Sequence, residues 1–199
     1  MSDVLLDWQS LLILNHQRLF GTVQRVDGKE GPELACRGWP GVGSGWRHIL
    51  DRLCQRIEAA TASEPAATFE FVQIKEKYGT LRAYDWSSGL SPAAELAVDT
   101  AIELAEARSA FVCEKCGERG HLWDDHGWYR TACDEHGKGR PLPPKPGRAG
   151  IGIITQYVGD RRLVTARRYD FDRDAFTPIA VPADYDAESG RWRDEQDES

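Results

Sequence analysis

Apolar residues predict helices in two stretches of the N-terminal half, one by their density and one by their helical period. Residues 4–20 are dense in leucine, isoleucine and aromatic side chains, which predicts a core helix. A second stretch runs from Trp46 to Ile57 with apolar residues at i, i+3, i+4, i+7, i+8 and i+11, which predicts an amphipathic helix. Ser44 lies just before this helix and is expected to cap its N-terminus.

A strand-like pattern follows in residues 69–86. This segment is rich in β-branched and aromatic residues and predicts two strands joined by a turn near Gly79. Alternation along the first strand places Val72 and Ile74 on one face and the two phenylalanines, Phe69 and Phe71, on the other. We therefore expect both faces of this hairpin to be covered.

A third helix and a second hairpin complete the pattern. Ser91 and Pro92 provide an N-cap and a first-turn proline for a helix that continues to about Ser109. Residues 151–169 predict a β-hairpin around Gly159-Asp160. The fold class expected from these elements is α+β, with a small antiparallel sheet, helices, a zinc-ribbon or zinc-knuckle module and a C-terminal β-hairpin.

Two pairs of metal-ligating residues come directly after the third helix. Cys113 and Cys116 form a Cys-x-x-Cys pair, and sixteen residues separate it from the Cys-x-x-His pair of Cys133 and His136. Two such pairs are typical of one tetrahedral zinc ion, and four protein ligands leave no open coordination position. Gly117 allows the turn after the first pair. The pattern predicts a structural zinc site, and zinc binding in small modules contributes roughly 10–16 kcal/mol.

Other histidines and cysteines fit this site less well. His121 and His126 fall inside the hairpin predicted between the ligand pairs, where an exposed turn histidine is the commoner explanation. Cys36 and Cys54 have no partner at ligand spacing, and Cys54 falls on the apolar stripe of a helix. An odd count of five cysteines and the lack of a signal-peptide pattern disfavour a disulfide framework and favour a reducing, cytoplasmic compartment.

Composition and charge suggest how the chain is divided. Residues 170–199 hold ten acidic and three basic side chains, which account for the whole net charge of −7, so residues 1–169 are neutral overall. No apolar run reaches the ~20 residues that a membrane span requires, so we expect no membrane association. The expected parts are an α+β domain (1–111), a zinc-binding module (112–137), a proline-rich basic linker (138–149), a β-hairpin (150–171) and a disordered acidic tail (172–199).

A glycine-rich loop, Gly41-Val-Gly-Ser-Gly45, precedes the second helix. Such loops can hold phosphate at a helix N-terminus. Here no strand is evident before the loop and no Lys-Ser/Thr pair follows it, so a tight loop is the favoured interpretation.

Two groups of residues are candidates for contact with a partner. Lys75, Lys77, Tyr78 and Arg82 gather at the turn of the first hairpin and suit phosphate contact beside an aromatic ring. Basic residues of the linker suit the same role: Lys138, Arg140, Lys145 and Arg148. The zinc hairpin instead offers aromatic anchors for a protein partner: Trp123, Trp128 and Tyr129.

An ordered series of motifs resembles a known group of proteins. The motifs are Gly43-Ser-Gly-Trp46, Gln73-Ile-Lys-Glu-Lys-Tyr-Gly-Thr-Leu-Arg82, Ala105-Glu-Ala-Arg-Ser109, Cys113-x-x-Cys-Gly117, Gly127-Trp128, Arg130-Thr131 and Cys133-Asp-Glu-His136. Together they resemble an uncharacterised family of small bacterial and bacteriophage proteins with a zinc-ribbon-like Cys-x2-Cys…Cys-x2-His element. The resemblance covers about residues 33–137 and implies a bacterial or phage setting rather than an activity.

The acidic hairpin tip also permits an enzymatic hypothesis. Asp125-His126 between two ligand pairs is similar in outline to phage recombination endonucleases of the His-metal finger type. In such an enzyme His126 would activate water, and Asp124 or Asp125 would bind a catalytic cation. No asparagine or helix follows His136 to complete that site, so polar residues at a solvent-facing turn are the favoured interpretation.

These observations favour one function over two others. We expect a non-enzymatic, zinc-stabilised binding or accessory protein that docks on a protein partner, because the neutral charge of residues 1–169 lacks the basic bias of a dedicated DNA binder. Nucleic-acid binding is the alternative hypothesis, and nuclease activity is the third.

Overall fold

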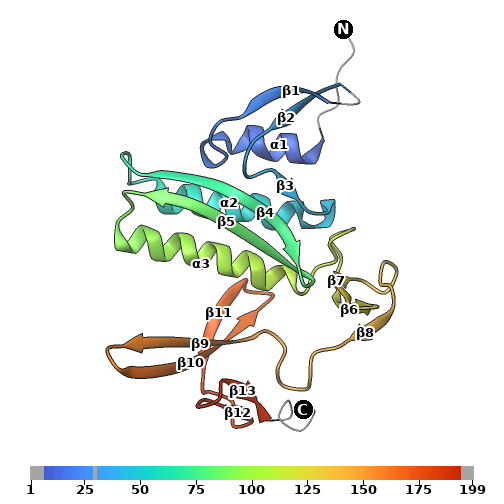
Figure 1. The fold of residues 1–199 in the computed structure, drawn as a ribbon, viewed down its shortest axis with the longest axis vertical. Helices are drawn as coiled ribbons and strands as arrows, with labels where there is room; N and C mark the ends of the chain where they lie inside the picture. The colour runs from blue at the N-terminus through green and yellow to red at the C-terminus, as the bar shows by residue number, and fades with distance from the viewer. Residues whose placement is uncertain (1–6, 29–30, 194–199) are drawn as a thin grey trace. The chain divides into compact units, whose positions relative to one another are not determined.

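The computed structural model describes residues 7–28 and 31–193, and the chain divides into two units, residues 1–143 and 144–199. The described residues form a mixed α+β fold with several small sheets, as predicted (Figure 1). None of the described helices is long and apolar enough to cross a membrane. The first unit contains α1 (Trp8–Asn15), β1 (Gln24–Gly28), β2 (Gly31–Ala35), β3 (Pro40–Gly41), α2 (Arg47–Thr61), β4 (Thr68–Lys77), β5 (Thr80–Ser88), α3 (Pro92–Ser109), β6 (His121–Asp125), β7 (Trp128–Ala132) and β8 (Arg140–Leu142).

The first helix is shorter than its apolar pattern predicted. The Asp7 carboxylate caps it by accepting a hydrogen bond of 2.7 Å from the Ser10 N–H, and a short 3-10 turn (Gln17–Leu19) follows it. Residues 4–6 of the predicted helix lie outside the described residues. Ile13 and Phe20 are fully buried, so this segment contributes to the core as expected.

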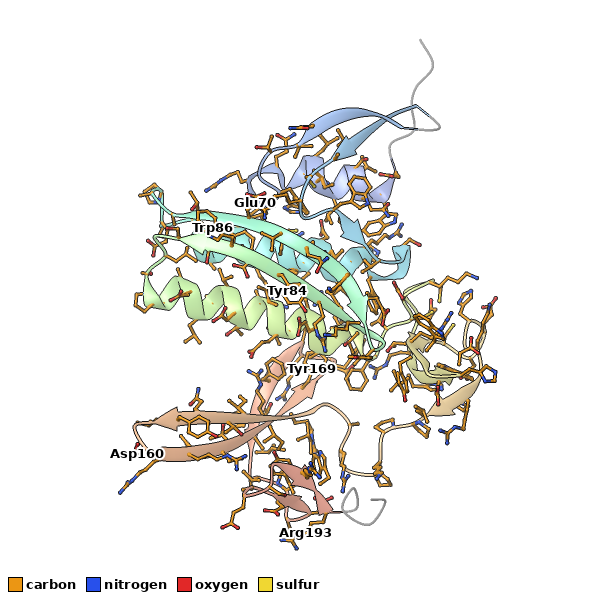
Figure 2. All side chains as sticks on the ribbon, viewed as in Figure 1. Glu70, Tyr84, Trp86, Asp160, Tyr169 and Arg193 are labelled. Carbon is orange, nitrogen blue, oxygen red and sulfur yellow. The ribbon has the colours of Figure 1, made fainter. Side chains whose placement is uncertain are left out.

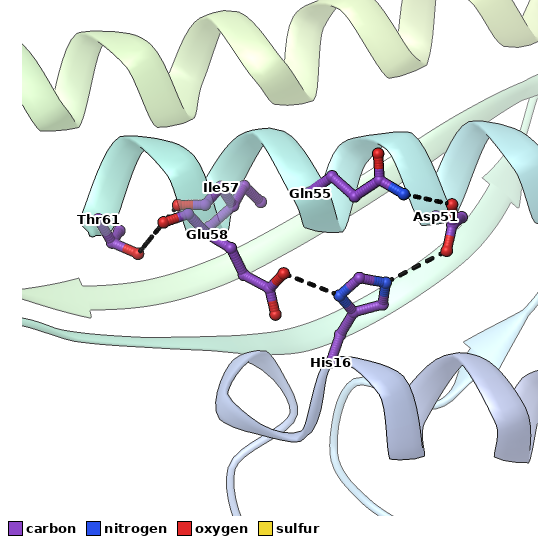
Figure 3. Close-up of polar contacts among 6 residues, drawn as sticks. All are labelled: His16, Asp51, Gln55, Ile57, Glu58 and Thr61. Carbon is purple, nitrogen blue, oxygen red and sulfur yellow. Dashed lines mark hydrogen bonds and ion pairs between the residues drawn. The ribbon is translucent and has the colours of Figure 1, made fainter.

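A buried histidine joins the end of α1 to α2 (Figure 3). The Nε2 atom of His16 lies 3.2 Å from the Oδ1 atom of Asp51, and its Nδ1 atom lies 3.0 Å from the Oε2 atom of Glu58. Both acidic residues belong to α2, seven positions apart on the face toward α1. The two carboxylates therefore hold one imidazole ring between them.

The amphipathic pattern of α2 is confirmed. Its buried positions are Ile49, Leu50, Leu53, Cys54, Ile57 and Thr61. The predicted cap is wrong, because Ser44 begins a 3-10 turn (Ser44–Trp46) before the helix, and its hydroxyl donates to the Lys115 carbonyl at 3.3 Å. Ser44 therefore connects the loop to the ligand segment instead of closing the helix end.

The hairpin of β4 and β5 is confirmed, with Gly79 in the left-handed region at φ 79°. The predicted division of its faces is wrong, because the strand pairing shifts register between Phe71 and Gln73. This bulge brings Ile74 to the same side as Phe69 and Phe71, and all three are buried. One face of the hairpin is therefore apolar and buried, whereas the other is partly exposed, so the expectation that both faces are covered is also wrong.

Helices α2 and α3 lie against the apolar face of the sheet formed by β3, β4 and β5 (Figure 1). Strand β3 pairs with β4 in parallel, whereas β4 and β5 are antiparallel. The predicted start of α3 is confirmed, with Ser91 accepting from the Ala94 N–H and Pro92 in the first turn. The helix then leads directly to Cys113.

The second unit is an antiparallel meander followed by a small hairpin. Its strands are β9 (Ile151–Val158), β10 (Arg161–Asp170), β11 (Ala175–Ile179), β12 (Tyr185–Asp186) and β13 (Arg191–Trp192). The hairpin around Gly159 is confirmed by the pairing of β9 with β10. Residues 175–192, which we expected to belong to a disordered acidic tail, include three of these strands, and the Tyr169 hydroxyl donates to the buried Asp174 carboxylate at 2.5 Å.

Candidate metal centre and binding surfaces

The two predicted ligand pairs converge in the first unit. Cys113 and Cys116 lie on a turn after α3, and Cys133 and His136 lie on a turn after β7, so the hairpin of β6 and β7 brings the turns together. The three Sγ atoms and one imidazole nitrogen all lie within 4.8 Å of one another. Among the described residues, this is the one group of histidine, cysteine and acidic side chains with such spacing.

The distances between ligand atoms fit a tetrahedral zinc ion. Zn–S bonds of about 2.3 Å and a Zn–N bond of about 2.0–2.1 Å require sulfur atoms about 3.8 Å apart and sulfur–nitrogen distances of about 3.5 Å. The Sγ atoms of Cys116 and Cys133 are 3.7 Å apart. The His136 Nδ1 atom lies 3.7 Å from Cys113 Sγ and 3.2 Å from Cys133 Sγ. The cluster can therefore hold a metal ion such as zinc.

The electrostatics of the thiols also favour a cation. Burial acts to raise the pKa of Cys113, but backbone N–H groups of Cys133, Cys116 and Lys115 outweigh burial and lower that pKa to about 7. The Glu118 N–H favours the thiolate of Cys116, yet desolvation and the neighbouring sulfurs raise the pKa of Cys116 to about 11. The thiolate of Cys113 therefore forms readily, whereas a second thiolate at Cys116 is disfavoured. A divalent cation bound between them would stabilise both negative charges.

The glycine-rich loop packs directly on the first ligand turn. The Gly45 N–H donates to the Glu114 carbonyl at 2.8 Å, and the Gly43 N–H donates to the Glu114 side chain at 2.9 Å. A Cβ atom on Gly45 would lie 2.2 Å from the Cys113 carbonyl oxygen. The glycines are therefore required by close backbone contact with the metal module, which supports the tight-loop interpretation over a phosphate site.

The turn of the β4–β5 hairpin packs on the second half of the module. The Thr131 hydroxyl donates to the Gly79 carbonyl at 2.6 Å, and the Thr131 carbonyl accepts from the Glu114 N–H at 3.1 Å. The Ser109 hydroxyl accepts from the Leu81 N–H at 2.8 Å. The hairpin turn thus contacts the second ligand segment through Thr131 and the end of α3 through Ser109.

Trp123 and His121 cover the second ligand turn. A Cβ atom on Gly137 would lie 2.1 Å from the Trp123 ring, and the indole N–H donates to the Ala132 carbonyl at 3.1 Å. The ring of His121 stacks on Trp123 with centroids 5.0 Å apart. Neither His121 nor His126 belongs to the ligand cluster, and Trp123 supports the turn from the side.

The acidic residues of the hairpin tip make local contacts. Asp124 accepts a hydrogen bond of 2.8 Å from the Gly127 N–H and lies 3.6 Å from Arg140. Asp125 lies 3.9 Å from Arg130, and His126 is exposed in the turn with φ 53°. These contacts favour the turn interpretation of the tip over the nuclease hypothesis.

The other two aromatic residues of the hairpin are exposed beside a groove. Trp128 is 76% exposed and Tyr129 is 39% exposed. Both line a groove of about 350 Å³ that extends to the first ligand turn. Arg130 and Glu114 line the same groove, and the Nε atom of Arg130 is buried with no hydrogen-bond partner.

The candidate residues of the first hairpin lie on its exposed face and turn. Lys75 pairs with Arg82 across the strands, and the Lys75 ammonium lies 5.4 Å from the centre of the Tyr84 ring. Lys77 lies over the ring of Tyr78 at 5.5 Å. Arg82 is held by Glu106 at 3.6 Å, so part of its charge is compensated.

The predicted basic linker is partly structured. Arg140 begins β8, which pairs with β6 as the third strand of the sheet that carries the metal module. Arg148 lies 2.7 Å from Asp184 and stacks on the Trp192 ring at 4.1 Å within the second unit. Lys138 and Lys145 are the remaining cations of this segment.

Comparison of the chain with known protein families, curated proteins and solved structures found no match. The sequence analysis assigned no site role to Glu114, Thr131 or Arg130, because none of them is a metal ligand. The available signal was position, since each lies within three residues of a ligand cysteine.

Proposed function

We propose that this chain is a non-enzymatic binding protein of a bacterial or phage-infected cytoplasm, in which a structural zinc ion holds a hairpin that docks on a protein partner. The observation that carries the proposal is Trp128, which is 76% exposed at the edge of the groove beside the ligand cluster. Exposed tryptophans beside a groove are typical anchors of protein interfaces.

The groove also supports a particular chemistry for the partner. Arg130 lines it with a side chain that is 41% exposed, and its ion pair with Asp125 is long, at 3.9 Å. A backbone carbonyl or carboxylate from a partner would accept a charge-assisted hydrogen bond from the exposed part of this guanidinium. The proposed partner segment therefore places an apolar side chain against Trp128 and an oxygen acceptor near Arg130.

A photocrosslinking experiment tests this function. The photoreactive residue p-benzoylphenylalanine is placed at Tyr129, beside the groove, or at Leu96, which is 67% exposed on α3 and serves as the control. We expect a discrete protein adduct in bacterial lysate from position 129, resistant to nuclease treatment, and none from position 96. Loss of the adduct on nuclease treatment, an equal adduct from both positions or no adduct would contradict the proposal.

Two further variants localise the contact. In the crosslinking chain, Trp128→Ala is expected to remove most of the adduct and Arg130→Gln to weaken it. Trp86→Ala, another exposed tryptophan of the same unit, is expected to leave the adduct unchanged. Equal effects of Trp128→Ala and Trp86→Ala would place the partner elsewhere.

A further inference from the structure

The exposed face of the β4–β5 hairpin carries a row of aromatic rings. Tyr84 and Trp86 lie two residues apart on β5, so their side chains point to the same side of the sheet. They are 42% and 57% exposed, whereas Leu81 and Ala83 of the same strand are buried. Figure 2 labels both rings on this hairpin.

The strand register extends this row with cations. Trp86 pairs with Glu70, Tyr84 pairs with Gln73, Arg82 pairs with Lys75, and Thr80 pairs with Lys77. Along the hairpin toward its turn, two cross-strand pairs that contain an aromatic ring are thus followed by two pairs that contain basic residues. Tyr78, 69% exposed in that turn, adds a third ring.

The single carboxylate in these four pairs does not oppose the cations. Glu70 lies at the far end, where it pairs with Trp86 across the strands. Its carboxyl group packs against Gly21, so that a Cβ atom added to Gly21 would lie 2.3 Å from the carboxyl carbon. The ammonium groups of Lys75 and Lys77 lie over the Tyr84 and Tyr78 rings. Positive charge and exposed aromatic faces therefore occur together at the turn end of the face.

We propose that this face, built from Lys75, Lys77, Tyr78, Tyr84 and Trp86, binds single-stranded nucleic acid. Aromatic side chains stack with unpaired bases of any sequence, and lysines beside them contact the phosphate backbone. Residues two apart on a strand are separated by roughly 6.8 Å, so bases on Tyr84 and Trp86 belong to an extended strand rather than a duplex. None of these five residues lines the zinc hairpin groove, although the hairpin turn beside Tyr78 packs on the metal module, and the site does not depend on the proposed protein partner.

Fluorescence anisotropy of a labelled oligothymidylate of about 12 nucleotides tests this site with the full-length, zinc-loaded protein. At physiological salt we expect a dissociation constant in the range of about 10⁻⁴–10⁻⁶ M, with weaker binding of a duplex of equal length. Trp86→Ala and Tyr84→Ala should each weaken binding about five-fold or more, which is the loss of one base stack. Trp128→Ala should leave it unchanged.

The salt dependence tests the role of the lysines. Lys75→Gln with Lys77→Gln should lower the slope of log affinity against log salt by about 1.4, the counterions released by two phosphate contacts on a single strand. Circular dichroism and zinc content are measured on each variant, so that a folding defect is recognised. No anisotropy change up to about 10⁻⁴ M protein, equal binding of the duplex, or full binding by folded Trp86→Ala would overturn the proposal.

Discussion

The indole N–H of Trp46 donates a hydrogen bond to the carbonyl oxygen of Val112, 2.8 Å away, and both residues are buried. Trp46 follows the glycine-rich loop, and Val112 directly precedes the first ligand, Cys113. The bond therefore joins the metal module to the start of α2. Trp46 thereby supports the backbone that leads into the first ligand turn.

Replacing Trp46 by phenylalanine should separate packing from hydrogen bonding at this contact. Trp46→Phe keeps an aromatic ring but leaves the buried Val112 carbonyl without its donor, so we expect a loss of about 1–3 kcal/mol in the free energy of unfolding. Urea denaturation of the zinc-loaded protein measures this loss. Trp86→Phe, on the exposed face, is the control, and equal stability of the two variants would contradict the expectation.

The contact of Gly45 with the first ligand turn predicts a larger sensitivity than usual for a loop glycine. In Gly45→Ala the added Cβ would lie 2.2 Å from the Cys113 carbonyl oxygen, so the loop or the ligand turn must shift. We expect a cost of about 1–3 kcal/mol and weaker zinc binding in a competition titration with a chelator. At Gly152 the nearest atom is 3.8 Å away, so Gly152→Ala should change neither quantity.

Much of the fold was predictable because its signals are local. The periodicity of α2, the Ser91 cap of α3 and the spacing of Cys113 and Cys116 each lie within one element, where a sequence pattern determines the structure directly. The bulge after Phe71 was not predictable in this way. It depends on which residues the two helices can cover, so it reversed the predicted position of Ile74.

The candidate sites show the same difference. Residues far apart in the sequence make the decisive contacts, as between Gly45 and Glu114 or between Gly79 and Thr131. No pattern in one segment reveals such pairs. Tyr84 and Trp86 were not predicted as contact residues, although alternation along β5 places both on one face.

The buried His16 predicts that α1 depends on α2 for its stability (Figure 3). His16→Ala leaves Asp51 and Glu58 without the ring between them, and we expect a loss of about 1–3 kcal/mol. The substitution should accelerate hydrogen exchange more in residues 8–20 than in α3. His48→Ala removes an exposed histidine of α2 and should leave exchange unchanged. Uniformly faster exchange in His16→Ala would contradict a local role.

Replacement of either of two acidic residues, Asp85 and Asp99, should stabilise the protein. Burial, and then the charge of Asp99 on α3, raise the pKa of Asp85. A raised pKa in the folded state gives stability that is complete below the unfolded-state pKa and is lost as pH rises through the folded-state pKa. Asp85→Asn should therefore be more stable than wild type at pH 7, by less than about 1 kcal/mol because solvent screens this half-buried position.

A double-mutant cycle isolates the repulsion between these two residues. Asp99→Asn removes the same unfavourable contact, so the gain in the double variant should be smaller than the sum of the two single gains. Thermal unfolding at pH 7 measures the stability of wild type, the two single variants and the double variant. The difference in stability between Asp85→Asn and wild type should shrink as the pH is lowered toward the pKa range of carboxyl groups. Strict additivity of the two gains would indicate that Asp85 and Asp99 do not interact.

The pKa values of the ligand thiols predict pH-dependent zinc binding. Zinc must displace protons from thiols such as Cys116, whose pKa is raised to about 11 in the metal-free chain, so binding should release protons. The apparent affinity should therefore fall as the pH is lowered, including across the pKa of Cys113 at about 7. Titration calorimetry in buffers of different ionisation enthalpy measures the released protons. An affinity independent of pH would argue against thiolate ligands.

Native mass spectrometry, with thermal unfolding before and after chelation, is the most direct test of the zinc-stabilised module. We expect one zinc ion per chain, its loss in Cys133→Ser, and a marked fall in melting temperature when a strong chelator removes it, because metal binding contributes to folding in such modules. A triple variant at Asp124, Asp125 and His126 should keep the zinc ion. A chain that binds no zinc, or that keeps both zinc and stability in Cys133→Ser, would contradict the account.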